Sequence, residues 1–240
     1  MEIHTYDDLH IHEETHWWYL GRYRIIESFL RTYCKKAAQV LDVGAGTGYN
    51  TFLLGEYAEK VFALEPADAA IKLFKNKNVT IFQSDLVSFT TAERFDLVTL
   101  FDVLEHLQDD TLALEKIKNL LSPGGRVLLT VPALPLLWSA HDEVHHHYRR
   151  YTKKSLQYLA DVAGFTVVRM TYFNFFLFPI IYVVRMIGRL FPNKQSSDFR
   201  RLPSGINAFL TWIFGFERHV LKLLDIPFGV SLICVLEKAK

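Results

Sequence analysis

The chain has 240 residues, half of them hydrophobic, and its 27 basic and 26 acidic side chains give a formal net charge of +1. This length suits one α/β domain with a large core, and the near-neutral charge gives no reason to expect a nucleic-acid partner. The N-terminal stretch is neither basic nor followed by an apolar run, so we expect no signal peptide. Cys34 and Cys234 stand in apolar surroundings, which is typical of reduced structural thiols in the cytoplasm.

Strands and helices alternate along most of the chain. The N-terminal stretch 10–33 predicts one or two helices rich in aromatic residues. After it, apolar runs predict strands over 39–44, 61–65, 79–82, 95–101 and 126–131, with helices over 49–57, 67–76 and 109–121. A long polar and aromatic loop is expected over 133–150. This alternation predicts a parallel sheet with helices on both faces and right-handed crossovers.

The C-terminal part continues this pattern and then departs from it. Thr152 is a candidate N-cap for a helix over 153–163, and Gly164 is the residue that would end it. Two further strands are expected over 165–172 and 230–236, and between them two helices over 174–191 and 206–224, joined by the polar linker 192–205.

The segment 173–224 is both basic and aromatic. Its charged residues are Arg185, Arg189, Lys194, Arg200, Arg201, Arg218 and Lys222 against Asp198 and Glu217, a net charge of +5 that leaves −4 for the rest of the chain. Its densest apolar run, Phe173 to Val184, is shorter than the about 20 residues that a membrane span needs. A basic, aromatic segment of this size can still lie on a membrane surface.

A glycine-rich turn follows the first predicted strand. Gly44, Gly46 and Gly48 are spaced by two, and Glu65 lies at the end of the next strand. Glycine permits positive φ and close approach of a ligand, and a carboxylate at this distance suits ribose hydroxyls. The dinucleotide fingerprint would need glycine where the chain has Tyr49, which disfavours a pyrophosphate ligand. The alternative is an ordinary strand-to-helix turn.

With these features the chain resembles a class I S-adenosylmethionine-dependent methyltransferase over about 39–172 and the final strand. The resemblance rests on Leu41-Asp42-Val43-Gly44-Ala45-Gly46-Thr47-Gly48, Glu65-Pro66, Ser84-Asp85-Leu86, Phe95-Asp96-Leu97-Val98, Val103-Leu104-Glu105-His106-Leu107 and Leu121-Ser122-Pro123-Gly124-Gly125. It implies an α/β, Rossmann-like seven-stranded sheet of order 3-2-1-4-5-7-6 with strand 7 antiparallel. The implied parts are an N-terminal helical cap (1–36), the S-adenosylmethionine-binding domain (37–172 and 228–240) and a helical insertion between strands 6 and 7 (173–227).

The resemblance also implies how the cofactor is held. The glycines would let its methionyl part lie on the backbone, Asp42 would attract its ammonium, and Glu65 would take both ribose hydroxyls. Asp85 would accept from the adenine amino group, and Leu86 would donate from its backbone and offer an apolar wall. The carbonyl of Phe101 would accept from the ammonium, and His106 would lie near the sulfonium. The alternatives are a helix N-cap for Asp85 and a buried turn acid for Asp42.

A polar loop rich in histidine follows the fifth strand, at the edge where open α/β folds bind ligands. An oxygen nucleophile needs a base near neutral pH, so His141, His145 and His146 are the candidate catalytic residues. Tyr148 and Arg149 are candidate acceptor contacts; the alternative is a solvated polar loop. His141 and His145 could also bind a metal, but they lack a third ligand at firm spacing. Asp102, Glu105 and His106 could likewise bind a metal, the alternative being that His106 packs near the sulfonium pocket; we assign no metal.

The N-terminal helix adds Trp17, Trp18 and Arg22 as candidate acceptor contacts, because they resemble a cap folded over the cofactor. The alternative is that their rings fill a core between helix and sheet.

The sequence therefore predicts S-adenosylmethionine-dependent methyl transfer by in-line displacement, to an oxygen of a small or amphiphilic acceptor such as a lipid or lipid-linked glycan. We expect a cytoplasmic protein with peripheral membrane contact or a homodimer through 173–224, and no nucleic-acid partner. One alternative is an oxidoreductase that binds NAD or a nucleotide sugar; another is a non-catalytic cofactor-binding or membrane-docking protein.

Overall fold

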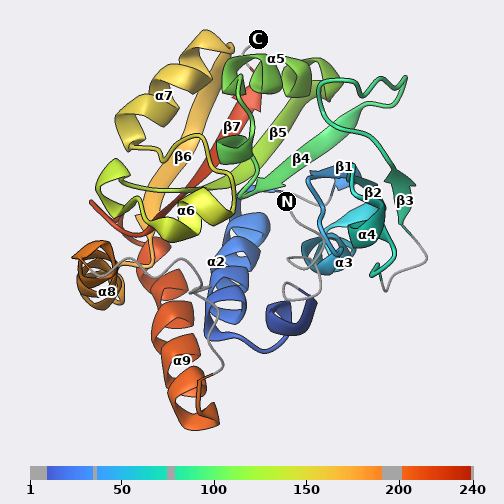
Figure 1. Cartoon of the computed structure of the whole chain (residues 1–240). Helices are drawn as coiled ribbons and strands as arrows, with labels where there is room; N and C mark the ends of the chain where they lie inside the picture. Colours follow the sequence, from blue (N-terminus) through green and yellow to red (C-terminus); the bar gives the residue numbers. More distant parts are fainter. Residues whose placement is uncertain (1–9, 35–36, 75–78, 191–201, 239–240) are drawn as a thin grey trace.

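The computed structural model describes residues 10–34, 37–74, 79–190 and 202–238. In this part, the strands form one sheet in the order β3-β2-β1-β4-β5-β7-β6 (Figure 1). The strands are β1 (Ala37–Val43), β2 (Ala58–Leu64), β3 (Thr80–Phe82), β4 (Phe95–Phe101), β5 (Leu121–Pro132), β6 (Phe165–Phe173) and β7 (Ser231–Lys238). β7 runs antiparallel to both β5 and β6, whereas the pairs from β3 through β5 are parallel. The predicted strand order and the antiparallel seventh strand are confirmed.

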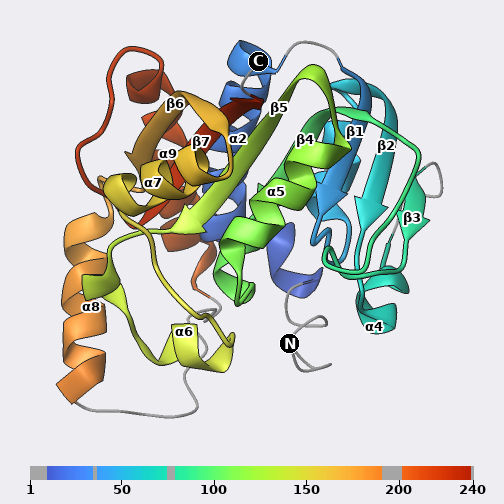
Figure 2. The ribbon, with the colours of Figure 1, turned by 90° about the horizontal axis from the view of Figure 1, so that it is seen from above.

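Helices cover both faces of the sheet. The helices of the described part are α2 (Trp17–Tyr33), α3 (Tyr49–Leu54), α4 (Asp68–Ile71), α5 (Asp110–Leu120), α6 (Ala140–Val144), α7 (Lys153–Val162), α8 (Phe178–Leu190) and α9 (Ser204–Leu221), with 3₁₀ turns η1 (Leu104–His106) and η2 (Pro135–Leu137). Figure 2 shows α5 and α7 on one face, with α2 and α9 on the other. The central strands are therefore buried on both sides, which explains why β4 reads as an almost continuous apolar run.

Local sequence signals define several helix ends. Asp109 caps α5 by accepting from the backbone N–H of Leu112 at 2.8 Å. Thr152 and Ser155 form a capping box at the start of α7, and Gly164 takes a positive φ of 75° just after that helix. The predicted cap and stop of this helix are confirmed.

Several bounds differ from those expected from the sequence; β5 begins at Leu121 and not at 126, and α3 ends at Leu54. Two elements differ in kind or extent. The predicted loop 133–150 contains η2 and the short helix α6, which a capping box between Ser139 and Asp142 holds at its N-terminus. The predicted helix 67–76 is only the single turn α4; residues 75–78 lie outside the described part. Both differences concern elements too short for a helical period to emerge from the sequence.

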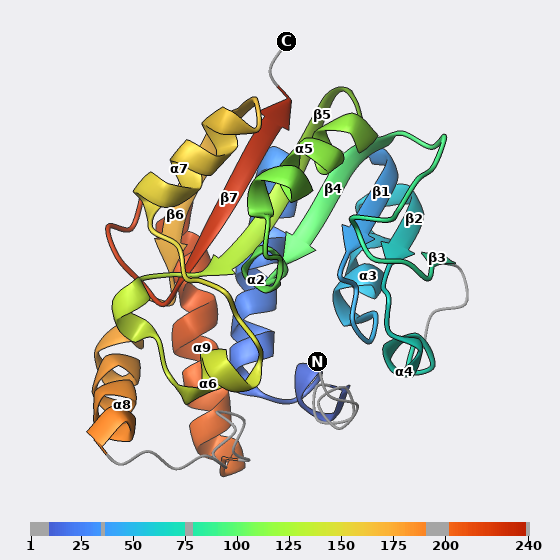
Figure 3. The same cartoon turned by 45° about the horizontal axis from the view of Figure 1, so that its top comes forward.

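The insertion between β6 and β7 consists of α8 and α9, which project beyond the carboxyl edge of the parallel strands (Figure 3). α9 packs along α2, where a Cβ on Gly21 would stand 2.4 Å from the ring of Phe214. Most of the predicted linker 192–205, including Lys194, Arg200 and Arg201, lies outside the described residues. Among the helices that are described, none is long and apolar enough to cross a membrane.

Candidate active site

The glycine turn joins β1 to α3 at the carboxyl edge of the sheet. Gly44, Gly46 and Gly48 have φ values of 66°, 58° and 85°, the left-handed region that a side chain disfavours. A Cβ on Gly44 would stand 2.6 Å from the side chain of Val103, and one on Gly48 would stand 2.7 Å from the ring of Phe74. The turn therefore needs glycine for both its backbone conformation and its packing.

Glu65 lies directly after β2 and reaches across to this turn. Its carboxylate accepts from the backbone N–H of Gly46 at 2.8 Å and from that of Ala67 at 3.0 Å. Burial raises the pKa of Glu65, and the two backbone donors partly oppose that shift. Each carboxylate oxygen has a second lone pair, so Glu65 can brace the turn and still accept from a ligand hydroxyl.

Asp42 lies beneath the turn and is buried. Its two oxygens accept from the hydroxyls of Thr51 at 2.6 Å and Thr99 at 2.7 Å, which ties α3 to β4. Burial raises the pKa of Asp42 to about 6. These contacts are those expected of a buried turn acid, the alternative that the sequence left open for this residue.

The residues predicted at the adenine end follow β3. Asp85 is exposed and accepts from the backbone N–H of Ser88 at 2.8 Å, and this hydrogen bond lowers its pKa. Asp85 thus caps a turn, while Leu86 beside it is buried in the core. A capping carboxylate keeps free lone pairs, so the turn contact and an adenine contact are compatible.

An ion pair connects the ends of β4 and β5 to the N-terminal helix. The guanidinium of Arg22, from α2, lies 2.7 Å from the carboxylate of Asp102 and donates to the hydroxyl of Thr130 at 3.1 Å. Asp102 takes a positive φ of 58°, an uncommon conformation for an aspartate, directly after Phe101. Arg22 also stands 5.8 Å from the Phe101 ring. The predicted residue Arg22 therefore lies at the site edge, but its charge is already neutralised.

The N-terminal segment covers the glycine turn through residues that the sequence did not single out. The carboxylate of the buried Glu13 accepts from the hydroxyl of Thr47, which lies within the turn. Trp17 and Trp18 instead pack on α9, with ring centroids 6.0 and 5.5 Å from that of Phe214. The two rings therefore lie between α2 and α9, whereas the alternative stated for them was a core between helix and sheet.

Histidines from two loops meet beside η1. His106 comes from η1, and His141, His145 and His147 come from α6 and the residues after it; the His106 and His147 rings lie 4.6 Å apart, and those of His141 and His145 lie 4.3 Å apart. Burial lowers the pKa of His106 to about 3 and that of His145 to about 4, so both are neutral at pH 7. His146, the third predicted base, is exposed and has no ring contact to this cluster among those described.

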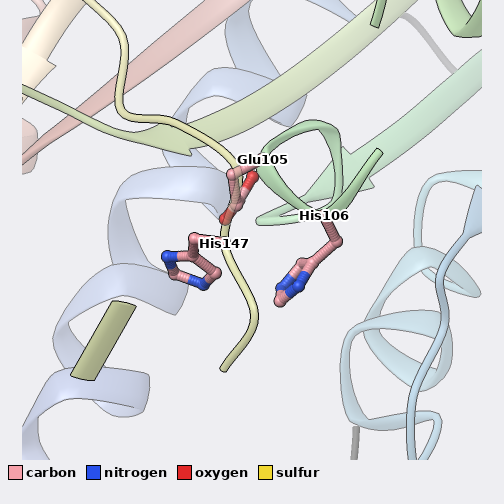
Figure 4. Close-up of side chains that lie close together, drawn as sticks. All are labelled: Glu105, His106 and His147. Atoms are coloured by element: carbon pink, nitrogen blue, oxygen red, sulfur yellow. The ribbon is translucent and has the colours of Figure 1, made fainter. Parts of the chain in front are cut away.

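Two residues of this cluster were not among the predicted cofactor, acceptor or catalytic residues: His147, and Glu105, which was named only as a possible metal donor. One ligand-type atom from each of Glu105, His106 and His147 lies within 4.8 Å of the others (Figure 4). Glu105 is fully buried, and neither of its oxygens has a hydrogen-bond partner among the described residues. Burial, reinforced by the nearby Asp102, raises the pKa of Glu105 well above its usual value.

Asp142 organises the loop around the histidines. Its buried carboxylate lies 2.9 Å from Nδ1 of His147, accepts from Nε of Arg150 at 2.8 Å and accepts from the backbone N–H of Ser139 at 2.9 Å. Although burial opposes the shift, His147 and Arg150 hold the pKa of Asp142 well below its usual range. The signal available in the sequence was the run of three histidines, in which the residue facing the cluster could not be told from its neighbours.

The two predicted acceptor contacts after this run anchor the loop. The backbone N–H of Tyr148 donates to the carbonyl of Glu105 at 2.7 Å, and the Tyr148 side chain is exposed. Arg149 pairs with Asp110 at 2.7 Å and donates to the carbonyl of Gln108 at 2.6 Å. Both contacts fix the loop against the segment that follows β4.

Comparisons with known proteins agree with this architecture. The family model described as a methyltransferase domain matches residues 2–170. A probable S-adenosylmethionine-dependent methyltransferase of Mycolicibacterium smegmatis is 27% identical over 160 residues, which cover 65% of this chain and 61% of that protein. A ubiquinone biosynthesis O-methyltransferase of Coxiella burnetii is 28% identical over 102 residues, 40% of this chain and 44% of that protein. The chain thus spans less than two thirds of the length of these relatives.

Solved structures show the same fold at low sequence identity. The N-methyltransferase NodS from Bradyrhizobium japonicum, in complex with S-adenosyl-L-homocysteine, superposes with a TM-score of 0.56 at 15% identity. The superposition covers 92% of this chain and 88% of NodS.

Proposed function

Because this chain belongs to the methyltransferase-domain family, within the class I S-adenosylmethionine-dependent methyltransferases, we propose that it transfers the methyl group of S-adenosylmethionine to an oxygen of its acceptor. One observation carries this proposal: the glycine turn and the histidine cluster lie at the same carboxyl edge of the sheet. Val103, the residue before η1, packs directly on Gly44. The donor and the groups that would face an acceptor are thereby held next to each other.

The residues at the turn fit the cofactor. Its three left-handed glycines leave backbone without side chains, and Glu65 offers buried lone pairs at the end of β2. Bound there, S-adenosylmethionine supplies a methyl group on a positively charged sulfur. Glu65 would hold the ribose and Asp85 the adenine amino group, while the carbonyl of Phe101 would orient the methionyl end. Holding the nucleophile and the methyl group in line can lower the activation barrier by several kcal/mol, and by about 7–11 kcal/mol at the upper limit.

The acceptor side is proposed to be the loop after β5. Burial lowers the pKa of both His141 and His145, so both are neutral at pH 7, and we propose that their rings face the acceptor hydroxyl. The low pKa of His145 makes it a weak base, and its main effect would then be to position the acceptor. Replacing His145 by Ala should lower turnover and leave the affinity for S-adenosylhomocysteine unchanged.

For the acceptor class, we propose an amphiphilic molecule reached at a membrane surface. Two apolar stripes at helical spacing support this: Ile180, Val183, Val184 and Ile187 on α8, and Ile206, Phe209, Trp212 and Phe216 on α9. All eight side chains are between 46% and 61% exposed. An exposed apolar surface of this kind is typical of membrane or partner contact.

The arginines of α8 also make contacts within the protein. Arg185 donates to the carbonyl of Leu137 at 2.6 Å, and Arg189 donates to those of Leu136 and Trp138, both at 2.8 Å. These contacts fasten α8 to η2. Reversing their charge would therefore disturb the fold, and the membrane proposal is better tested on the apolar stripes.

A flotation assay tests the membrane proposal with a matched control. With vesicles of phosphatidylglycerol and phosphatidylcholine, we expect the wild type to float and the double variant Phe209→Ser, Trp212→Ser to stay in the soluble fraction. Tyr158→Ser is the control, because Tyr158 is 72% exposed on α7 outside the insertion. If all three proteins remain soluble at low salt, membrane contact is contradicted, and sedimentation then tests whether the stripes join two copies of the chain.

A label-transfer assay tests the reaction itself. The protein is incubated with methyl-labelled S-adenosylmethionine and either the organic or the aqueous extract of its host cells. We expect label in the organic phase, and none with the Gly44→Ala variant. Label confined to the aqueous phase would indicate a soluble acceptor, and absence of label from both phases would contradict methyl transfer.

A further inference from the structure

We propose that Glu105, His106 and His147 bind a divalent transition-metal ion of the Zn²⁺ class beside the glycine turn. One donor atom from each residue lies within 4.8 Å of the other two (Figure 4). At the tetrahedral angle, ligand bonds of about 2.0–2.2 Å place two donors about 3.3–3.6 Å apart, so side-chain rotations that bring the donors roughly 1 Å closer would close the set around an ion.

Glu105 is the residue that most requires a partner. It is fully buried, and both of its oxygens lack a hydrogen-bond donor within the described part of the chain. The nearby arginines are already paired with other carboxylates, Arg22 with Asp102 at 2.7 Å and Arg150 with Asp142 at 2.8 Å. A carboxylate in such a place is costly unless a cation compensates it.

His147 is oriented in the way that metal-binding histidines are. Its Nδ1 lies 2.9 Å from the carboxylate of Asp142, which also accepts from Arg150 and Ser139. Because this carboxylate can only accept, we assign the proton to Nδ1, which leaves the lone pair of Nε2 available for an ion. A carboxylate that holds the far nitrogen of a ligating histidine is a recurrent support of metal sites.

His106 completes a donor set of two imidazoles and one carboxylate. It lies next to Glu105 on η1, and its ring meets that of His147 at 82°. This donor set suits Zn²⁺ or Co²⁺ better than Mg²⁺ or Ca²⁺, which prefer oxygen ligands. Three protein ligands leave a fourth position open, as in catalytic zinc sites.

The position of the ion gives it a role in the proposed methyl transfer. Val103, the residue before η1, packs against Gly44. An ion bound by Glu105 and His106 would therefore lie next to the glycine turn, on the side that faces the acceptor. An acceptor hydroxyl in the open position would lose its proton more readily, since a bound cation lowers the pKa of an oxygen ligand. This role rests on the proposed function, whereas binding of the ion does not.

Metal binding can be measured without an acceptor. EDTA-treated, dialysed protein is titrated with ZnCl₂ by calorimetry and with CoCl₂ by visible absorption, which reports tetrahedral nitrogen–oxygen ligation. We expect one ion per chain in the wild type. Glu105→Gln keeps the shape of the side chain and removes its carboxylate. This variant and His147→Ala should each weaken Zn²⁺ binding at least tenfold and abolish the Co²⁺ band.

The matched control is His146→Asn. His146 is the exposed neighbour of His147, and asparagine tolerates its φ of 55°. We expect this variant to bind Zn²⁺ as the wild type does. The proposal is overturned if the wild type binds no ion, or if Glu105→Gln and His147→Ala bind as tightly as His146→Asn. Calorimetry with S-adenosylhomocysteine on the same samples shows whether each protein is folded and has an intact donor site, so a loss of Zn²⁺ binding is not mistaken for unfolding.

Discussion

Replacing Gly44 by alanine tests whether the glycine turn is required in the form described. Gly44 has a φ of 66°, and a Cβ there would stand 2.6 Å from Cγ2 of Val103. The left-handed conformation costs an alanine about 1–2 kcal/mol, and forcing a methyl group into a packed site costs about 1–3 kcal/mol more. Val103 is β-branched and cannot turn aside easily. The free energy of unfolding should therefore fall by about 2–5 kcal/mol.

Gly124 provides a control that separates the two costs. It has a similar φ of 75°, but a Cβ there would meet nothing within 4 Å. Gly124→Ala should therefore lose only the conformational part, about 1–2 kcal/mol. In a double-mutant cycle, Val103→Ala should restore part of the stability lost in Gly44→Ala, because it removes the clash but not the strained φ.

Urea unfolding measures the stabilities, and calorimetry with S-adenosylhomocysteine measures the function of the turn. Gly44→Ala should lose affinity for this ligand, while Gly124→Ala, which lies before the buried part of β5, should keep it. The reasoning is refuted if the two alanine variants lose the same stability and if both bind the ligand as the wild type does.

Three further predictions concern single side chains. Glu65→Ala should weaken S-adenosylhomocysteine binding by about tenfold to a hundredfold, since a hydrogen bond to a charged group contributes about 1.5–3 kcal/mol; unchanged affinity by calorimetry would contradict the ribose role. Burial raises the pKa of Glu217 from 4.5 to about 7, so the folded protein retains a proton that the unfolded chain releases. Stability relative to Glu217→Gln should therefore fall as pH rises from 4.5 to about 7, by about 3 kcal/mol, and equal pH profiles in urea unfolding would refute this. His141→Ala should lower methyl transfer without changing S-adenosylhomocysteine affinity; equal loss of both would place His141 in the donor site.

The sheet was predictable because its signals are local and repeated. Each strand from β1 to β4 is an apolar run followed by a polar or glycine-rich turn, and α5 carries a helical period. Thr152 and Gly164 indicated where α7 begins and ends, because they are typical helix-capping residues. The strand order and the antiparallel β7 came from the resemblance and not from the pattern alone.

The candidate site was only partly predictable, because side-chain contacts depend on packing between distant segments. The glycine turn and Glu65 are brought together as expected, since both follow neighbouring parallel strands. In contrast, His145, His146 and His147 are consecutive, and only the path of the chain after α6 decides which ring faces His106. Glu105 could be named as a metal-type donor, but its burial and its closeness to His147 depend on packing that the sequence does not show.

The aromatic and basic residues were misleading for a related reason. Composition cannot tell a tryptophan that packs on another helix from one that covers a ligand, and Trp17 and Trp18 proved to pack on Phe214. Likewise, Arg185 contributes to the basic charge of the insertion, yet its guanidinium donates to the carbonyl of Leu137. In both cases the partner lies far away in the sequence.

The central claim is that the glycine turn and Glu65 form a site for S-adenosylmethionine. Calorimetric titration of the wild type with S-adenosylhomocysteine and, separately, with NAD tests it most directly, because Tyr49 stands where a dinucleotide site would have glycine. We expect saturable binding of one S-adenosylhomocysteine per chain, loss of that binding in Gly44→Ala, and no heat with NAD. Saturable binding of NAD without any response to S-adenosylhomocysteine would contradict it.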